Sequence, residues 1–170
     1  MSSSEERSIL LEHDSILQKI NRMAWQVYET NPHAKRLVLI GIAKKGTVIN
    51  TLLAERLRSI TKMEILEDEI IIDKGNPSSD KTSLKNGTAI KDEHVILVDD
   101  VLNSGQTLMY AALPILQQSP HKLQTCVLAN RDHKRFPIKG DFVGISLSTT
   151  LQEHISFERS KGGKMTVYLS

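Results

Sequence analysis

Hydrophobic residues follow two kinds of pattern along the chain, and each kind predicts a different element. Apolar side chains recur every three or four positions between residues 14 and 30, which predicts an amphipathic helix. Residues 48–57 repeat that spacing and predict a second helix. Continuous apolar runs at 37–42 and 94–98 instead predict strands that are covered on both faces.

The same patterns continue through the second half of the chain. Residues 107–113 begin a third helix, which Pro114 should kink because proline lacks an amide hydrogen. Residues 63–72 are expected to be extended, with an interruption at the acidic stretch 67–69. Further strands are expected at residues 123–129, 142–147 and 165–169. This alternation predicts an α/β fold with a mainly parallel twisted sheet flanked by helices, formed as a single domain over residues 1–170.

Residues 73–93 are polar and rich in Lys, Ser, Asn and Gly, without a pattern that would build a core. A stretch of about 20 such residues is uncommon inside a compact domain and often forms a mobile lid. A solvated hairpin without a role is an equally good interpretation of the composition.

Composition narrows the class of protein. The chain has 170 residues, 39% of them hydrophobic, and a formal net charge of +2, which does not by itself indicate a nucleic-acid or membrane partner. Its single cysteine, Cys126, excludes an intrachain disulfide and is expected to be a buried structural thiol. No apolar run approaches the roughly 20 residues of a membrane span, and the N-terminus lacks a secretory pattern, so we expect a cytoplasmic protein without a membrane partner.

Two loops are candidates for a ligand site, because ligands of open α/β sheets lie beyond the carboxyl ends of the strands. One loop follows Ile42 and the other follows Val98. The second begins with the paired carboxylates Asp99 and Asp100, continues through hydroxyl, amide and glycine residues at 103–107, and leads into a helix.

A helix start offers unpaired amide hydrogens and partial positive charge to a phosphate. Gly105 would let the backbone approach the anion, and Ser104 and Thr107 would add hydroxyl donors. The two carboxylates would repel a phosphate but accept hydrogen bonds from sugar hydroxyls, so the loop fits a ribose 5-phosphate. The alternative is an acidic helix cap followed by an ordinary turn; the combination after so apolar a strand favours the ligand site.

The segment from Val95 to Thr107 resembles the phosphoribosyl-diphosphate signature of type I phosphoribosyltransferases. Within that superfamily, the chain is most similar to the pyrimidine-operon regulatory proteins, whose members often have uracil phosphoribosyltransferase activity. The resemblance extends over residues 9–150 and includes the segments 21–24, 41–46, 127–138 and 141–144.

The resemblance implies a phosphoribosyl diphosphate substrate bound with Mg²⁺, a nucleobase acceptor, a small hood and a flexible lid loop over the sheet, and a homodimer. Asp99 and Asp100 would be the catalytic residues that hold the ribose hydroxyls, directly or through waters of the metal. The implied substrate-binding residues are these two together with Ala43, Lys44, Lys45, Asn103, Ser104, Gly105, Gln106, Thr107 and Arg131. Mg²⁺ would be held mostly by substrate oxygens and waters, so no residue is expected to form a dedicated metal cage.

The chain departs from the family pattern at several positions. Asn103 replaces the aspartate that acts as a base in oxopurine enzymes, which argues against hypoxanthine and guanine. Gln106 replaces an arginine of the pyrimidine group, and Asn130 and Asp132 replace an aspartate and a glycine. The leading hypothesis is an enzyme that uses uracil. The alternatives are a regulatory protein that senses a nucleotide or phosphoribosyl diphosphate and contacts RNA, and an interaction domain that uses this fold as a scaffold.

Overall fold

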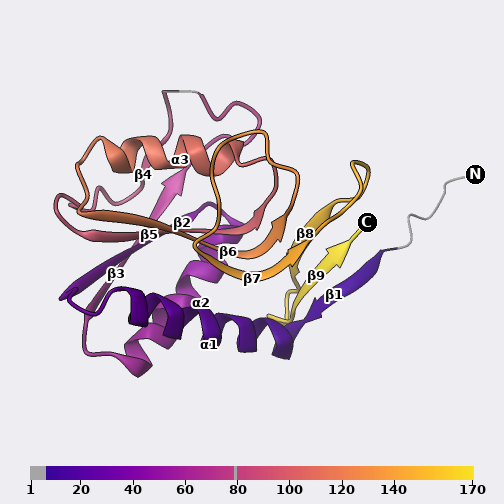
Figure 1. The fold of residues 1–170 in the computed structure, drawn as a ribbon, viewed down its shortest axis with the longest axis horizontal. Helices are drawn as coiled ribbons and strands as arrows, with labels where there is room; N and C mark the ends of the chain where they lie inside the picture. Colours follow the sequence, from indigo (N-terminus) through magenta and orange to yellow (C-terminus); the bar gives the residue numbers. More distant parts are fainter. Residues whose placement is uncertain (1–6, 79) are drawn as a thin grey trace, which may run out of the picture.

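Five strands pair side by side in one parallel sheet, to which a short antiparallel strand is added (Figure 1). The structure is a computed structural model, and it describes residues 7–78 and 80–170. In spatial order the six strands are β4 (Ser83–Leu84), β3 (Glu64–Ile71), β2 (Arg36–Ile42), β5 (His94–Leu102), β6 (Lys122–Arg131) and β7 (Phe142–Leu147). The predicted α/β class and the strands at 37–42, 123–129 and 142–147 are confirmed.

Helices cover the sheet on both faces (Figure 1). The two helices α1 (His13–Thr30) and α2 (Lys45–Ile60) lie on one face, and α3 (Gln106–Leu116) lies on the other. The apolar stripe of α1 is buried against the first face, as its spacing predicts. Within the part of the chain that the structure describes, none of the helices combines the length and apolarity that a bilayer crossing requires.

Two strands are longer and more regular than the sequence indicates. The prediction of a strand that ends at Val98 is wrong, because β5 continues through the two aspartates to Leu102, whose register partner on β6 is Asn130. The predicted interruption at residues 67–69 is also wrong, because these residues stay in parallel register with β2 throughout. Backbone pairing to a central strand overrides the low strand preference of acidic side chains.

A second, small antiparallel sheet joins the two ends of the chain. Its strands are β1 (Ser8–Glu12), β9 (Met165–Leu169) and β8 (Ile155–Arg159), in that order. Phe157 on β8 and Val167 on β9 are buried, and they belong to the same hydrophobic core as the buried side chains of α1. The strand predicted at 165–169 is confirmed, whereas the sequence did not indicate β1 or β8. This sheet is the small hood that the resemblance implies.

Cys126 is buried in β6, and burial raises the pKa of its thiol to about 12. Its sulfur lies 3.8 Å from the Met23 sulfur on α1. The prediction of a structural thiol is therefore confirmed, since a thiol with so high a pKa is not a nucleophile at neutral pH.

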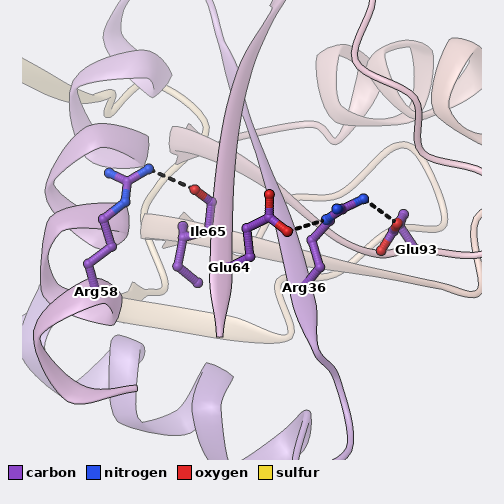
Figure 2. A network of polar contacts seen from close by, with 5 residues as sticks. All are labelled: Arg36, Arg58, Glu64, Ile65 and Glu93. Carbon is purple, nitrogen blue, oxygen red and sulfur yellow. Dashed lines mark hydrogen bonds and ion pairs between the residues drawn. The ribbon is translucent and has the colours of Figure 1, made fainter. Parts of the chain in front are cut away.

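Ion pairs tie the elements together at the amino ends of the strands (Figure 2). The Arg36 guanidinium on β2 donates to the Glu64 carboxylate at 2.9 Å and to the Glu93 carboxylate at 3.0 Å. Arg58 on α2 donates to the Ile65 carbonyl at 2.8 Å. These contacts hold the amino ends of the strands together. The opposite ends of the strands, their carboxyl ends, remain available for ligand-binding loops.

Asp68 attaches the polar segment 73–93 to the sheet. Its buried carboxylate accepts backbone N–H bonds from Glu69 at 2.7 Å, Asn86 at 3.0 Å and Thr88 at 3.0 Å. Burial by itself would raise the pKa of Asp68, but the hydrogen bonds outweigh it and hold the pKa below its ordinary value. The return limb of the segment is thereby fixed beside β3, where β4 also pairs.

We expect the substitution Asp68→Asn to lower the free energy of unfolding by about 1–3 kcal/mol at neutral pH. The amide that replaces one carboxylate oxygen would face a backbone N–H and leave it unpaired. Because the folded-state pKa is depressed, the carboxylate stabilises the fold above the unfolded pKa of about 3.9 and ceases to do so as the pH falls through the folded value.

Chemical denaturation of both proteins across pH measures this difference, which should shrink below about pH 4. Glu69→Gln is the matched control, because Glu69 is the adjacent acid and contacts the exposed Lys85. A Glu69→Gln effect as large as that of Asp68→Asn would contradict the interpretation.

Candidate functional site

Asp99 and Asp100 lie near the carboxyl end of β5 and are almost completely buried, with 3% and 6% of their surfaces exposed. The Asp99 carboxylate accepts the Asp100 backbone N–H at 2.9 Å. The paired carboxylates are therefore rigidly placed by the central strand rather than carried on a mobile loop.

Burial raises the pKa of Asp99 well above its ordinary value, and the adjacent charge of Asp100 raises it further. The Lys74 ammonium, 3.7 Å from Asp99 and 3.9 Å from Asp100, opposes that increase. Two carboxylates in this position need a cation or hydroxyl donors to carry their charge. A magnesium ion or a sugar diol satisfies that requirement.

The loop after β5 leads into α3 through a single glycine. Gly105 has a φ of +89°, and a Cβ at this position would lie 2.7 Å from the Ile138 side chain. The Ser104 carbonyl accepts backbone N–H bonds from Arg135 at 2.9 Å and Phe136 at 3.1 Å. The segment after β6 therefore fixes this loop through backbone hydrogen bonds. Only glycine fits the turn at position 105.

The first turn of α3 borders a cavity of about 110 Å³. The first backbone bond of the helix runs from the Met109 N–H to the Gly105 carbonyl, so the amides before Met109 have no acceptor within α3. Besides residues 101–108 of the loop, the cavity is lined by Lys74, Asp99 and Val127. It is smaller than a pocket for a whole drug-sized ligand, roughly 300 Å³ or more, and suits a phosphate group.

The loop after β2 lies against the carboxylates. A Cβ on Gly46, in the first turn of α2 just after this loop, would lie 2.8 Å from the Val98 carbonyl and 3.0 Å from the Asp99 carboxylate, so a side chain there would push the start of α2 away from β5. Ala43 donates its N–H to the Ile70 carbonyl at 3.1 Å, and the peptide bond from Ala43 to Lys44 is cis. Lys44 and Lys45 are exposed at this turn. The structure thus brings the two loops that the sequence singled out to one place.

The sheet topology explains why they meet. The chain leaves β2 toward β3 on one side, and it leaves β5 toward β6 on the other. The connecting helices α2 and α3 cover opposite faces (Figure 1). This reversal of strand order opens a crevice between the ends of β2 and β5, which is where open α/β sheets bind ligands.

Arg131 lies apart from this cavity. It is 9% exposed at the end of β6, and its guanidinium donates to the Thr149 hydroxyl at 2.6 Å and the Thr150 carbonyl at 2.8 Å. His133 also contacts the Thr149 carbonyl. In this structure both side chains secure the connection from β7 to β8, and the substrate-binding role of Arg131 stays a prediction.

Lys74 is the site residue that sequence reasoning missed. It follows β3, whose carboxyl end lies at the same end of the sheet as the two loops. Its position after a parallel strand was the signal available in the sequence. Within residues 7–78 and 80–170, no cluster of three or more His, Cys, Asp or Glu side chains could hold a metal ion. The oxygen ligands of the aspartate pair suit Mg²⁺, whose remaining ligands would then come from substrate and water.

The chain is similar to known proteins over most of its length. The family model described as the phosphoribosyl transferase domain matches residues 6–160. A protein named bifunctional protein PyrR from Ligilactobacillus salivarius is 34% identical over 157 residues, which are 85% of this chain and 88% of that protein. Its namesake from Clostridium kluyveri is 28% identical over 91% of this chain and 92% of its own length.

Solved structures of hypoxanthine phosphoribosyltransferases have the same fold. A mutant of the Trypanosoma cruzi enzyme, complexed with the product IMP, has a TM-score of 0.73 and 20% identity over 86% of this chain and 81% of its own. A hypoxanthine-guanine phosphoribosyltransferase from Bacillus anthracis has a TM-score of 0.70 and 21% identity, covering 82% of each chain.

We expect Gly105→Ala to weaken binding of ribose 5-phosphate by roughly tenfold or more and to destabilise the fold by about 2 kcal/mol. The methyl group would combine a strained φ with a clash against Ile138. Gly87→Ala is the matched control, because Gly87 has a φ of +62° but a Cβ added there would meet nothing within 4 Å. Calorimetric titration and thermal unfolding of both variants measure the two effects. Equal losses in the two variants would show that the loop needs no close approach at Gly105.

Proposed function

The chain belongs to the phosphoribosyl transferase domain family, and from this we propose that it transfers ribose 5-phosphate from phosphoribosyl diphosphate to uracil. The observation that carries the proposal is the buried pair Asp99 and Asp100 between the phosphate-sized cavity and the loop after β2. One ligand that carries a phosphate, a diol and a pyrophosphate in that order would fill all three places.

The ribose would lie over the carboxylates. Its hydroxyls donate hydrogen bonds, and Asp99 and Asp100 accept them without repelling the sugar. The 5-phosphate would enter the cavity at the start of α3, where Ser104, Gln106 and Thr107 line the wall. Backbone amides of that turn and the helix dipole favour the anion.

The aspartate pair fits Mg²⁺, because two buried carboxylates already attract an ammonium ion in this structure. Mg²⁺ supplies charge neutralisation for the pyrophosphate. In the transfer, the bond from C1′ of the ribose to pyrophosphate breaks and its electron pair leaves with pyrophosphate. A bond from C1′ to a base nitrogen forms, and that nitrogen loses its proton to water or to the departing pyrophosphate. Lys44, Lys45 and the amides of their turn would offset the charge that develops on the leaving group.

Uracil is the acceptor that the sequence favours. The side chain of Asn103 is a neutral amide and cannot act as the base that oxopurine transfer uses. The relatives with 28–34% identity carry the name PyrR, whereas the hypoxanthine enzymes with 20–21% identity share the fold. A homodimer, implied by the resemblance, is part of the same proposal.

We expect pyrophosphate release from phosphoribosyl diphosphate and Mg²⁺ to be fastest with uracil in a panel of uracil, hypoxanthine, guanine and adenine. Asp100→Asn should lower that rate by roughly tenfold or more, since it removes a charge from the ribose and metal site. Asp92→Asn is the matched control: Asp92 is exposed, has a φ of 59°, which asparagine tolerates, and precedes the opposite end of β5. Release that stays at background with every base would refute the enzyme proposal.

A second function is favoured by the name of the relatives, which describes them as bifunctional. We propose as the alternative a regulatory protein that senses phosphoribosyl diphosphate or a nucleotide and contacts RNA. Filter binding with a structured RNA at 50–300 mM salt, roughly the range in which phosphate contacts are lost, tests it. Affinity that falls steeply with salt is the expected result; absence of binding at the lowest salt removes the RNA role.

A further inference from the structure

Lys74 lies between the polar segment 73–93 and the candidate site. It lies three residues after the end of β3, at the start of the polar segment 73–93. Among residues 7–78 and 80–170, it is the one basic residue that forms ion pairs with Asp99 and Asp100. It also lines the phosphate-sized cavity. Its charge therefore lies between the carboxylates and the place for the phosphate.

The contacts of this lysine are electrostatic rather than tightly bonded. Its nitrogen is 3.7 Å from the Asp99 carboxylate and 3.9 Å from the Asp100 carboxylate, beyond the usual length of a hydrogen bond. Its side chain is 46% exposed, whereas those of the two aspartates are 4% and 8% exposed. A half-exposed, flexible side chain thus holds a buried pair of acids without being locked to it.

We propose that Lys74 is a displaceable countercation, which balances the aspartate pair in the ligand-free protein and moves to the phosphates of the ligand when a divalent metal arrives. The inference rests on the proposed function, because it takes phosphoribosyl diphosphate with its metal as the ligand that displaces the lysine. It adds to that function a coupling between metal entry and the position of the Lys74 side chain.

The displacement follows from charge. A divalent cation bound to Asp99 and Asp100 repels an ammonium that lies within 4 Å of the same carboxylates. The nearest compensating negative charge is then the phosphate in the adjacent cavity, which Lys74 already lines. The lysine side chain is a flexible chain of four carbons, so its ammonium can make that move without a change in the sheet.

The substitution Lys74→Met tests the first half of the proposal with Mn²⁺ alone as the probe. Removing the competing ammonium should tighten Mn²⁺ binding to the ligand-free protein about two- to tenfold, measured by the electron spin resonance of free Mn²⁺. Lys74→Arg keeps the charge and should stay near the wild type. Lys81→Met is the matched control, because Lys81 is an exposed lysine of the same segment without an ion pair to these acids among the described residues.

The second half predicts a change of opposite sign. Calorimetric titration with phosphoribosyl diphosphate in excess Mg²⁺ should show about threefold or weaker binding by Lys74→Met, because the phosphates lose their lysine. Tighter Mn²⁺ and weaker phosphoribosyl diphosphate together support the proposal. Unchanged, weaker or undetectable Mn²⁺ binding by Lys74→Met overturns it, as does unchanged or tighter binding of phosphoribosyl diphosphate. If the wild type itself does not bind phosphoribosyl diphosphate, the proposed function fails; if it does, only the role of Lys74 is in question.

Discussion

The structure is organised around two adjacent carboxylates buried at the end of a central apolar strand. Water hardly reaches Asp99 and Asp100, and this burial raises the pKa of Asp99, so any negative charge on the pair has to be stabilised by the groups around it. The amino end of α3 and the Lys74 ammonium supply positive charge near them. In the absence of a ligand, the half-exposed Lys74 ammonium is the cation that lies nearest to this pair among the described residues.

Two glycines allow the backbone to come close enough for that arrangement. A side chain at Gly46 would push the start of α2 away from Asp99, and one at Gly105 would push the start of α3 away from Ile138. The reversal of strand order between β2 and β5 then directs the helices to opposite faces and leaves the crevice open. The site thus depends on backbone packing at two points more than on the identity of the exposed side chains.

The sequence was sufficient for the elements whose patterns are local. The helices α1 and α2 and the strands β2, β6 and β7 could be predicted from periodicity, and so could the meeting of the two loops. The strands β1 and β8 could not, because β1 pairs with β9 across more than 150 residues of chain and neither has a strong pattern. The length of β5 was missed because pairing with β6 keeps even two aspartates in the strand. Lys74 was missed because it lies in a polar segment without a pattern, and its ion pairs with Asp99 and Asp100 are contacts between distant parts of the sequence.

Local and long-range contacts are also separate near the end of β6, where Asn130 and Asp132 depart from the family pattern. The loop between β5 and α3 is held there by backbone bonds from Arg135 and Phe136 to the Ser104 carbonyl, which do not depend on which side chains are present. The side chains of Asn130 and Lys134 bond instead to each other, and Asn130 also reaches Ser146 on β7. Side chains at 130–134 can therefore change without moving Ser104, so the loop before α3 keeps its geometry whichever side chains stand there.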